Sequence, residues 1–418
     1  MQVRDHPALS PVDELQHLDY VLKSPSAGIR VGEQLGQEAM RVVSCRGIGV
    51  PGWELGTPLL PECGHPQPDP SLSNTEGYNS AYPHTPAYYS ATALAGEVVL
   101  LLPGVDSPLV AYRLVGVAWL AAGLGLLWYA LGLVGLGVWG RAGIVGLLGV
   151  SPVVVDASAF LNPDATAMMA GGVVLVALLK WEMGRWPWWS VPIGSGVAVW
   201  LKLTNVSAVG VLVVYLGIRA WQERDRQNWA KQRERLGAAL GSILVSLGSL
   251  LIWQWWQGHR GLAAERDLPL FLHQRFDSFH WTSIAGMLRA TLTPFRNQWI
   301  PDGLPRDLLA PLGGIADVGL LGILGVAVAV TAARSPYRAL VGGVFAAMAG
   351  MGVLTLIASY LTLSRDPPVP GRYALAILPL AAAAIAPVLR RKAIARALVG
   401  ALALATAGAM LSGVAVAG

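Results

Sequence analysis

Long apolar segments recur from about residue 87 to the C-terminus, whereas residues 1–86 are polar and rich in Pro and Gly. A helix needs roughly 20 apolar residues to cross the hydrocarbon core of a bilayer. The segments that approach this length are 87–104, 109–133, 141–156, 163–180, 189–219, 236–257, 309–333, 338–363, 371–389 and 396–417. The pattern therefore predicts an all-α, polytopic transmembrane bundle of about ten spans. The longest segment, 189–219, is long enough to be two helices.

Composition agrees with this pattern. The 418 residues are 54% hydrophobic and 13% charged, and the mean hydropathy is +0.51. Ordinary soluble domains contain about 25% charged residues. A water-soluble fold cannot bury this much apolar surface, so the composition indicates an integral membrane protein.

The basic residues suggest an orientation in the membrane. The formal net charge is +5, and cytoplasmic loops of membrane proteins are enriched in Lys and Arg. Residues 219–236 and 390–396 are strongly basic, and Arg334 and Arg338 flank a third short loop. With these three loops inside, the segments predicted outside are 258–308, 364–371 and, counting back through the spans, 1–86.

This topology predicts four parts: 1–86, an extracytoplasmic loop with amphipathic helices; 87–257, an N-terminal transmembrane module; 258–308, a second extracytoplasmic loop; and 309–418, the C-terminal transmembrane helices. Two groups of tryptophans fit interfacial aromatic belts: Trp186, Trp188 and Trp189, and Trp253, Trp255 and Trp256. Residues 1–10 have no apolar core and are not a signal peptide. Export of a long polar tail is unusual, so we expect a first transmembrane helix to precede this sequence.

The polar N-terminal stretch contains both cysteines, Cys45 and Cys63. In an extracytoplasmic location they can form a disulfide. Two free thiols are the alternative.

A cluster of titratable side chains opens the chain in SPVDELQHLDYV, residues 10–21. On a helix Asp13 and His17 share one face, and Glu14 lies three residues before His17. A carboxylate beside a histidine is suited to act as a general base. The alternative is a solvated amphipathic helix on the outer leaflet. The same side chains could also bind a divalent ion, but no further ligand is identifiable, so we predict no metal site.

Other polar residues stand at the edges of apolar segments or, for Lys202, inside one. They are His84 in NSAYPHTPAYY, Asn162 and Asp164 in FLNPDATAMM, Lys202 in VWLKLTNVSA, and Arg372 with Tyr373 in PPVPGRYALAILPL. Charges in or beside a membrane are costly and indicate function by default. The structural alternatives are a turn residue for His84, a helix cap for Asp164, a Lys202 that snorkels or pairs with a carboxylate, and a flanking anchor for Arg372.

In this order the motifs resemble those of the polyprenyl-phosphate-sugar-dependent membrane glycosyltransferases of the GT-C superfamily. The nearest resemblance is to a bacterial branch related to the protein O-mannosyltransferases and the lipid A aminoarabinose transferases. The matching elements are Pro11, Asp13, Glu14 and His17; Pro83, His84, Pro86, Tyr88 and Tyr89; Asn162 and Asp164; Leu201, Lys202, Leu203 and Thr204; and Gly371, Arg372, Tyr373 and Pro379.

The sequence departs from the family pattern at two points. The first helix of the family is absent, and the charge rule puts Asn162 and Asp164 inside although the resemblance puts them near an outer cavity. We therefore expect that the count of membrane spans is wrong at one segment, 141–156 or 189–219.

The resemblance implies an enzyme that moves a sugar from a polyprenyl-phosphate donor to a hydroxyl acceptor on the extracytoplasmic face of the plasma membrane. It implies Asp13 or Glu14 as the catalytic base. It assigns substrate binding to His17, His84, Asp164, Lys202, Arg372 and Tyr373. No cofactor and no nucleic acid are implied, and the acceptor is an unidentified glycan, lipid or protein. A transporter or flippase of envelope lipids, or a non-catalytic assembly partner, is the alternative.

Overall fold

The computed structural model of the chain describes residues 8–10, 13–24, 28–48, 63, 69–72, 75–224, 229–263, 274–275, 281–295, 306–363, 365–366, 371–391, 393–394, 396–397 and 400. The α-helices are α2 (Glu14–Leu22), α3 (Gln37–Arg46), α4 (Pro86–Val99), α5 (Pro108–Leu133), α6 (Val138–Gly149), α7 (Pro152–Ala159), α8 (Ala167–Glu182), α9 (Ser190–Leu201), α10 (Val206–Gln222), α11 (Trp229–Arg260), α12 (Trp281–Leu292), α13 (Arg306–Val330), α14 (Pro336–Leu363), α15 (Leu378–Ala384) and α16 (Ala386–Leu389). Short 3-10 helices are η1 (Pro70–Leu72), η2 (Pro163–Thr166), η3 (Leu203–Asn205) and η5 (Gly371–Ile377).

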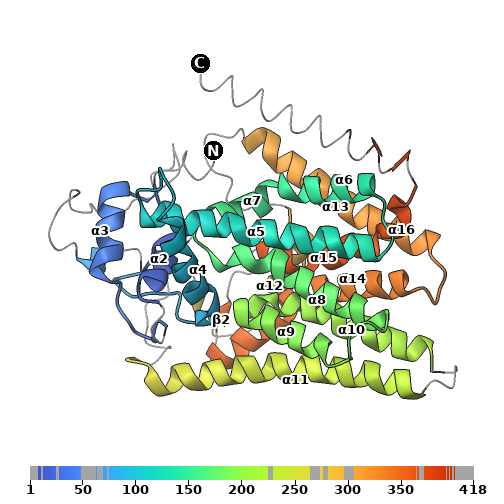
Figure 1. Cartoon of the computed structure of the whole chain (residues 1–418). Helices are drawn as coiled ribbons and strands as arrows, with labels where there is room; N and C mark the ends of the chain where they lie inside the picture. The colour runs from blue at the N-terminus through green and yellow to red at the C-terminus, as the bar shows by residue number, and fades with distance from the viewer. Residues whose placement is uncertain are drawn as a thin grey trace.

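The fold is all-α, as predicted. In the described part of the chain, the strands are one antiparallel pair of two residues each, β1 (Gln274–Arg275) and β2 (Arg365–Asp366). The long helices lie side by side, and α2, α3 and α4 form a separate layer at one end of them (Figure 1).

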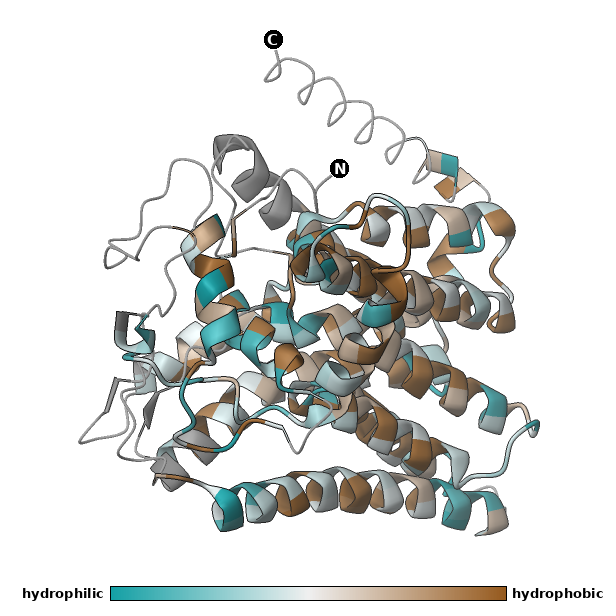
Figure 2. Ribbon diagram, turned by 60° about the vertical axis from the view of Figure 1, so that its left-hand side comes forward, coloured by the Kyte–Doolittle hydropathy of each residue, from teal (hydrophilic) through white to brown (hydrophobic). Residues whose placement is uncertain are grey.

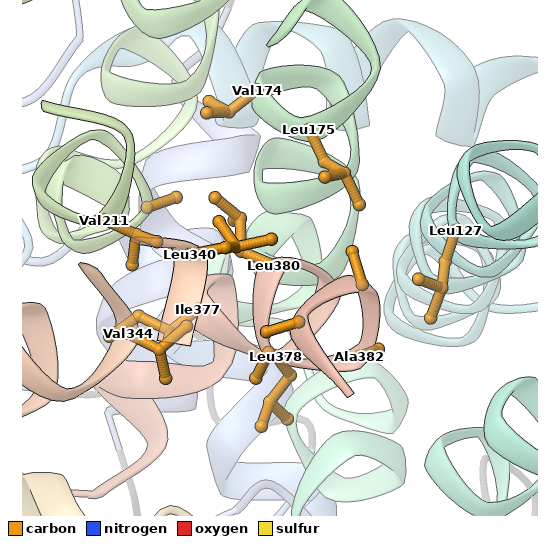
Figure 3. Packing of buried hydrophobic residues seen from close by; sticks show 14 of the residues in the cluster. Leu127, Val174, Leu175, Val211, Leu340, Val344, Ile377, Leu378, Leu380 and Ala382 are labelled. Carbon is orange, nitrogen blue, oxygen red and sulfur yellow. The ribbon is translucent and has the colours of Figure 1, made fainter. Parts of the chain in front are cut away.

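The long helices pack around one apolar core. α8 contacts α5 and α9, and α10 contacts α11 and α14. Leucine, valine and isoleucine side chains from α5, α8, α10, α14, η5 and α15 meet in this core (Figure 3). Small residues let the backbones approach: a Cβ at Gly171 of α8 would collide with the carbonyl oxygen of Ala376. The core therefore holds η5, a 3-10 helix of seven residues, close beside α8.

The layer formed by α2, α3 and α4, here called the terminal layer, has a second core. This core is made by apolar residues of these helices and of the start of α5. The disulfide left open by the sequence is present: Cys45, at the end of α3, is bonded to Cys63. Helix α2 is not a solvated surface helix, because every residue from Glu14 to Val21 is buried. That alternative interpretation of the opening stretch is therefore wrong.

The predicted count of about ten spans is not confirmed. Five helices of the described chain are long and apolar enough to cross a bilayer, or six if α6 and α7, bent by 59° at their junction, form one span. Segment 87–104 contains α4, which ends at Val99 after 14 residues and packs into the terminal layer. Segment 371–389 is divided among η5, α15 and α16. Most of segment 396–417 lies outside the described residues.

Segment 189–219 is two helices, and this explains the conflict over Asp164. α9 ends at Leu201, Lys202 is extended (φ −160°, ψ 130°), and α10 starts at Val206. Lys202 therefore lies at a helix break, rather than inside an apolar helix as its sequence context suggested. The extra reversal brings Asp164 and Lys202 to the end of the bundle that carries α2.

The opposite end of the bundle is basic. There the Arg219 side chain donates to the carbonyl of Arg334, and Arg390 donates to the carbonyl of Val134. The basic residues at these helix ends and turns are Arg141, Lys180, Arg185, Arg219, Arg224, Lys231, Arg233, Arg235, Arg334, Arg338, Arg390 and Arg391. The acidic residues described in the same turns are Glu182, Glu223 and Glu234, so cations predominate.

One face of α11 is exposed and apolar. Its exposed side chains include Leu240, Leu244, Leu247, Leu251 and Ile252. Colouring by hydropathy shows hydrophilic residues at both ends of this helix and hydrophobic residues between them (Figure 2). This distribution is typical of a helix that faces lipid. The division of the chain into four parts stays a prediction.

Candidate functional site

Titratable side chains gather where the terminal layer meets the bundle. Asp13 is the residue that caps the start of α2, and its backbone is left-handed (φ 59°, ψ 10°). Aspartate at this position usually bonds the free N–H groups of its own helix. The Asp13 carboxylate makes no such bond, and no hydrogen bond to it is found among the described residues. Its carboxylate is therefore available to a ligand.

Glu14, the neighbouring residue, is in the opposite situation. Its side chain is fully buried and forms a bidentate ion pair with Arg113, with Nε–Oε1 and Nη2–Oε2 distances of 2.8 and 2.7 Å. It also accepts hydrogen bonds from the backbone N–H groups of Ser10 and Leu161, at 2.6 and 2.8 Å. Four donors occupy the carboxylate, so Glu14 has little capacity left to accept a hydrogen bond from a ligand.

Asp164 bridges two cations from distant segments. It forms ion pairs with Lys202 Nζ and, at 2.9 Å, with Arg372 Nε. Asp164 does not cap its helix; the Asn162 side chain does so by accepting the Asp164 N–H at 2.8 Å. The Asp164 and Lys202 side chains are 2% exposed, whereas Arg372 is 17% exposed and is the most accessible of the three.

Tyr373 completes the cation site. Lys202 Nζ lies 4.6 Å from the centroid of the Tyr373 ring, and the Arg372 guanidinium lies 5.8 Å from it. The face of an aromatic ring attracts cations. Tyr373 thus helps to hold both cations beside Asp164.

The two predicted histidines lie together. His17 Nδ1 is 2.8 Å from the Tyr89 hydroxyl, and the His17 and His84 rings are 5.5 Å apart. Burial lowers the pKa of His17 well below its usual value, and the neighbouring His84, Lys202 and Arg372 lower it further. Burial also lowers the pKa of His84, to about 3. Both imidazoles are neutral at pH 7, so they serve as hydrogen-bonding groups rather than as cations.

The electrostatic surroundings of Asp13 suit a proton acceptor. Burial raises the pKa of Asp13, against the opposing effects of Arg372 and Lys202. A carboxylate with a raised pKa binds a proton more strongly when it is ionised. The left-handed backbone at Asp13 is a further sign, because such conformations concentrate at functional sites.

The structure brings the predicted residues Asp13, His17, His84, Asp164, Lys202, Arg372 and Tyr373 into one cluster, and Glu14 adjoins it. Sequence reasoning missed Arg113 and gave Tyr89 no role of its own. Arg113 had a readable signal, since it is a charge inside the apolar segment 109–133. Among the residues described, no group of three or more His, Cys, Asp or Glu side chains could hold a metal ion.

An apolar cleft of 450 Å³ lies beside α9, the helix that ends directly before Lys202. It is lined by Ala87, Ile193, Gly196, Val197, Trp200, Leu201 and Ser249, from α4, α9 and α11. Leu201 directly precedes Lys202, so the cleft ends one residue before the backbone of Lys202. The cleft is open, and its lining from α9 includes the exposed residues Ile193 and Val197.

Comparison with known proteins gave structural neighbours only. No family model matches the chain, and no curated protein matches it significantly. Two crystal structures are similar to it: ArnT from Cupriavidus metallidurans bound to undecaprenyl phosphate (17% identity, TM-score 0.45) and the apo state of the same protein (17%, 0.44). The matches cover 93% and 92% of this chain, but only 57% and 56% of the ArnT chains.

Proposed function

We propose that this protein is a membrane glycosyltransferase that moves a sugar from a polyprenyl-phosphate donor to a hydroxyl acceptor. The observation that carries the proposal is the placement of the free carboxylate of Asp13 in the electrostatic field of two cations, Lys202 and Arg372. A base and a phosphate-binding site are the two groups that this transfer needs.

The chemistry follows from these groups. The acceptor oxygen attacks the anomeric carbon, and Asp13 takes the proton of the acceptor hydroxyl. The bond between the anomeric carbon and the phosphate oxygen breaks, and its electron pair leaves with the lipid phosphate. The developing negative charge is stabilised by Arg372, whose planar guanidinium can bind two phosphate oxygens. Lipid phosphate is a good leaving group, so no second catalytic acid is required.

Lys202 and Arg372 both contact Asp164, and both lie in the electrostatic field of the Asp13 carboxylate. Two cations therefore face two carboxylates when Asp13 is ionised. Binding of a phosphate requires one of the cations to turn away from Asp164. Arg372 is the cation best able to turn toward a phosphate, because it is more exposed than Lys202.

The apolar cleft fits the lipid part of such a donor. A prenyl chain in the cleft would place its phosphate close to Lys202, the residue after Leu201. Burial of hydrocarbon adds binding free energy of about 25 cal/mol per Å². Because this burial is far from the reacting bond, it strengthens binding of the donor and does not selectively stabilise the transition state.

The orientation of the site is also a proposal. The end of the bundle away from the cluster carries the excess of Lys and Arg, which favours a cytoplasmic location for that end. The cluster then faces the extracytoplasmic side of the plasma membrane. The disulfide between Cys45 and Cys63 lies in the layer at the cluster end and fits an oxidising compartment.

The test is transfer by the full chain in liposomes, with a radiolabelled sugar on undecaprenyl phosphate as donor and envelope lipids, glycans or peptides as acceptors. We expect Asp13→Asn to abolish transfer but to leave donor binding within a few fold, because the base acts on the acceptor proton. Arg372→Gln should weaken both. Glu38→Gln, which changes an exposed acid of α3, is the matched control. Near-normal turnover by Asp13→Asn would refute the mechanism, and movement of intact donor without transfer would favour a flippase.

A further inference from the structure

One buried ion pair joins the two segments that carry the carboxylates of the site. Glu14 follows Asp13 directly, and Glu14 Oε1 accepts the N–H of Leu161 at 2.8 Å. Leu161 precedes Asn162, whose side chain accepts the N–H of Asp164 at 2.8 Å. A single side chain therefore connects the start of α2 with the start of η2.

Arg113 fixes this connection to the bundle. It lies on α5, a membrane-length helix, and its side chain is 1% exposed. Besides its two bonds to Glu14, its Nη2 donates to the carbonyl of Ala8 at 2.8 Å, and its guanidinium lies 5.3 Å from the centroid of the Phe160 ring. The ion pair thus contacts the chain on both sides: before α2 at Ala8 and before η2 at Phe160.

Asp13 needs such support. A left-handed backbone at a non-glycine residue costs about 1 kcal/mol or more and persists only where neighbouring contacts hold it. The N–H of Ser10 is bonded to Glu14 Oε2 at 2.6 Å, so the turn that contains Asp13 is closed by the Glu14 side chain. With Glu14 in that role, the Asp13 carboxylate is left free of the helix start.

We propose that Glu14 and Arg113 are a positioning pair that holds the base Asp13 and the cation-binding carboxylate Asp164 in a fixed relation. The inference rests on the proposed function of the cluster. Neither residue of the pair exchanges a proton with substrate. A displacement of about 1 Å at a reacting group can cost about 100-fold in rate, so the pair acts through geometry alone.

The rival role for Glu14 is that of the base itself, and a double variant separates the two. Loss of one partner from a buried ion pair leaves an uncompensated charge, whereas loss of both is often tolerated. The amide oxygen that Glu14→Gln retains can still accept the Leu161 N–H, so the double variant Glu14→Gln/Arg113→Met keeps this connection without an uncompensated charge. If the pair positions Asp13, the double variant should therefore be more active than either single variant. If Glu14 is the base, the double variant should be as inactive as Glu14→Gln.

The experiment measures three quantities on the full chain in liposomes or detergent. They are kcat for sugar transfer, Kd for undecaprenyl phosphate, and hydrogen exchange of peptides that cover residues 8–17 and 158–166. Arg235→Met is the matched control, because it breaks the ion pairs that the buried Arg235 side chain makes with Glu182 and Glu223 at the opposite end of the bundle.

We expect Glu14→Gln and Arg113→Met each to lower kcat about 100-fold, with Kd changed less than about threefold and faster exchange in both peptides. The double variant should regain at least about tenfold in kcat, and Arg235→Met should change neither kcat nor exchange in these peptides. Single variants with normal kcat, or a double variant no better than Glu14→Gln, would overturn the inference.

If the unmodified chain transfers no sugar, the proposed function fails. The hydrogen-exchange measurement alone then tests whether Glu14 and Arg113 connect the two segments. Faster exchange in both peptides of the single variants would then still support the connection between the two segments. Unchanged exchange would overturn it.

Discussion

Loss of the Asp164 carboxylate should lower the free energy of unfolding more than loss of either of the cations that it binds. The Asp164→Asn variant leaves Lys202 and Arg372 close together without their shared counterion. The Lys202→Met and Arg372→Gln variants each leave Asp164 with one remaining cation. The three side chains form one network, so the order of the three effects follows from which charges remain unpaired.

The magnitudes follow from burial. Removal of one partner from a buried ion pair typically costs about 3–5 kcal/mol, and Asp164 and Lys202 are each 2% exposed. We expect Asp164→Asn to lower the free energy of unfolding by about this amount. Loss of one hydrogen-bonded cation, with the other retained, should cost about 1–3 kcal/mol. Arg372→Gln should be the mildest, because Arg372 is partly exposed.

The assay is unfolding of the three variants and the unmodified chain in one detergent, followed by denaturant midpoint and by melting temperature. The double variant Asp164→Asn/Lys202→Met removes one negative and one positive charge and is the matched control. It should be more stable than Asp164→Asn alone. If Lys202→Met destabilises the protein as much as Asp164→Asn, the carboxylate is not the centre of the network and the reasoning is wrong.

Three further predictions concern the terminal layer and the orientation. The disulfide between Cys45 and Cys63 closes a short loop, so Cys45→Ser should lower stability by about 3 kcal/mol; two free thiols found by non-reducing mass spectrometry would contradict the bond. His84 has a pKa of about 3 in the folded protein and an ordinary value of 6.5. Between these values the unfolded chain binds a proton that the folded chain does not, so stability should fall as pH falls from 6.5 toward 3. The melting temperature of His84→Gln should depend less on pH in this window. In intact cells, a cysteine-specific reagent should label a cysteine introduced at Ser71 and not one at Gln227; the reverse result would overturn the proposed orientation.

Much of the candidate site could be predicted from the sequence because charges stand out in an apolar chain. Asp164, Lys202 and Arg372 lie within or beside apolar segments, where an unpaired charge is costly. Such residues must find partners or ligands, and the structure pairs these three with one another. Lys202 and Arg372, however, lie 38 and 208 residues from Asp164 in the sequence. No local pattern identifies them as its partners.

The distinction between Asp13 and Glu14 depends on tertiary contacts. The two carboxylates are adjacent and chemically similar, so the sequence presents them as equivalent candidates for the base. Glu14 is occupied by Arg113, 99 residues away, and by the backbone of Leu161, 147 residues away. Asp13 receives no such bonds from the described residues.

Hydropathy by itself determined the all-α membrane class, because in a bilayer each spanning segment must satisfy its own backbone hydrogen bonds. It did not determine the number of spans. The break at Lys202 carries no proline or glycine, and the segment around it is apolar on both sides. The structure allows this break because Lys202 reaches Asp164 across it, and the resulting reversal decides that Asp164 lies at the same end of the bundle as Asp13. Local composition specifies that helices form, whereas long-range charge pairing decides which of their ends meet.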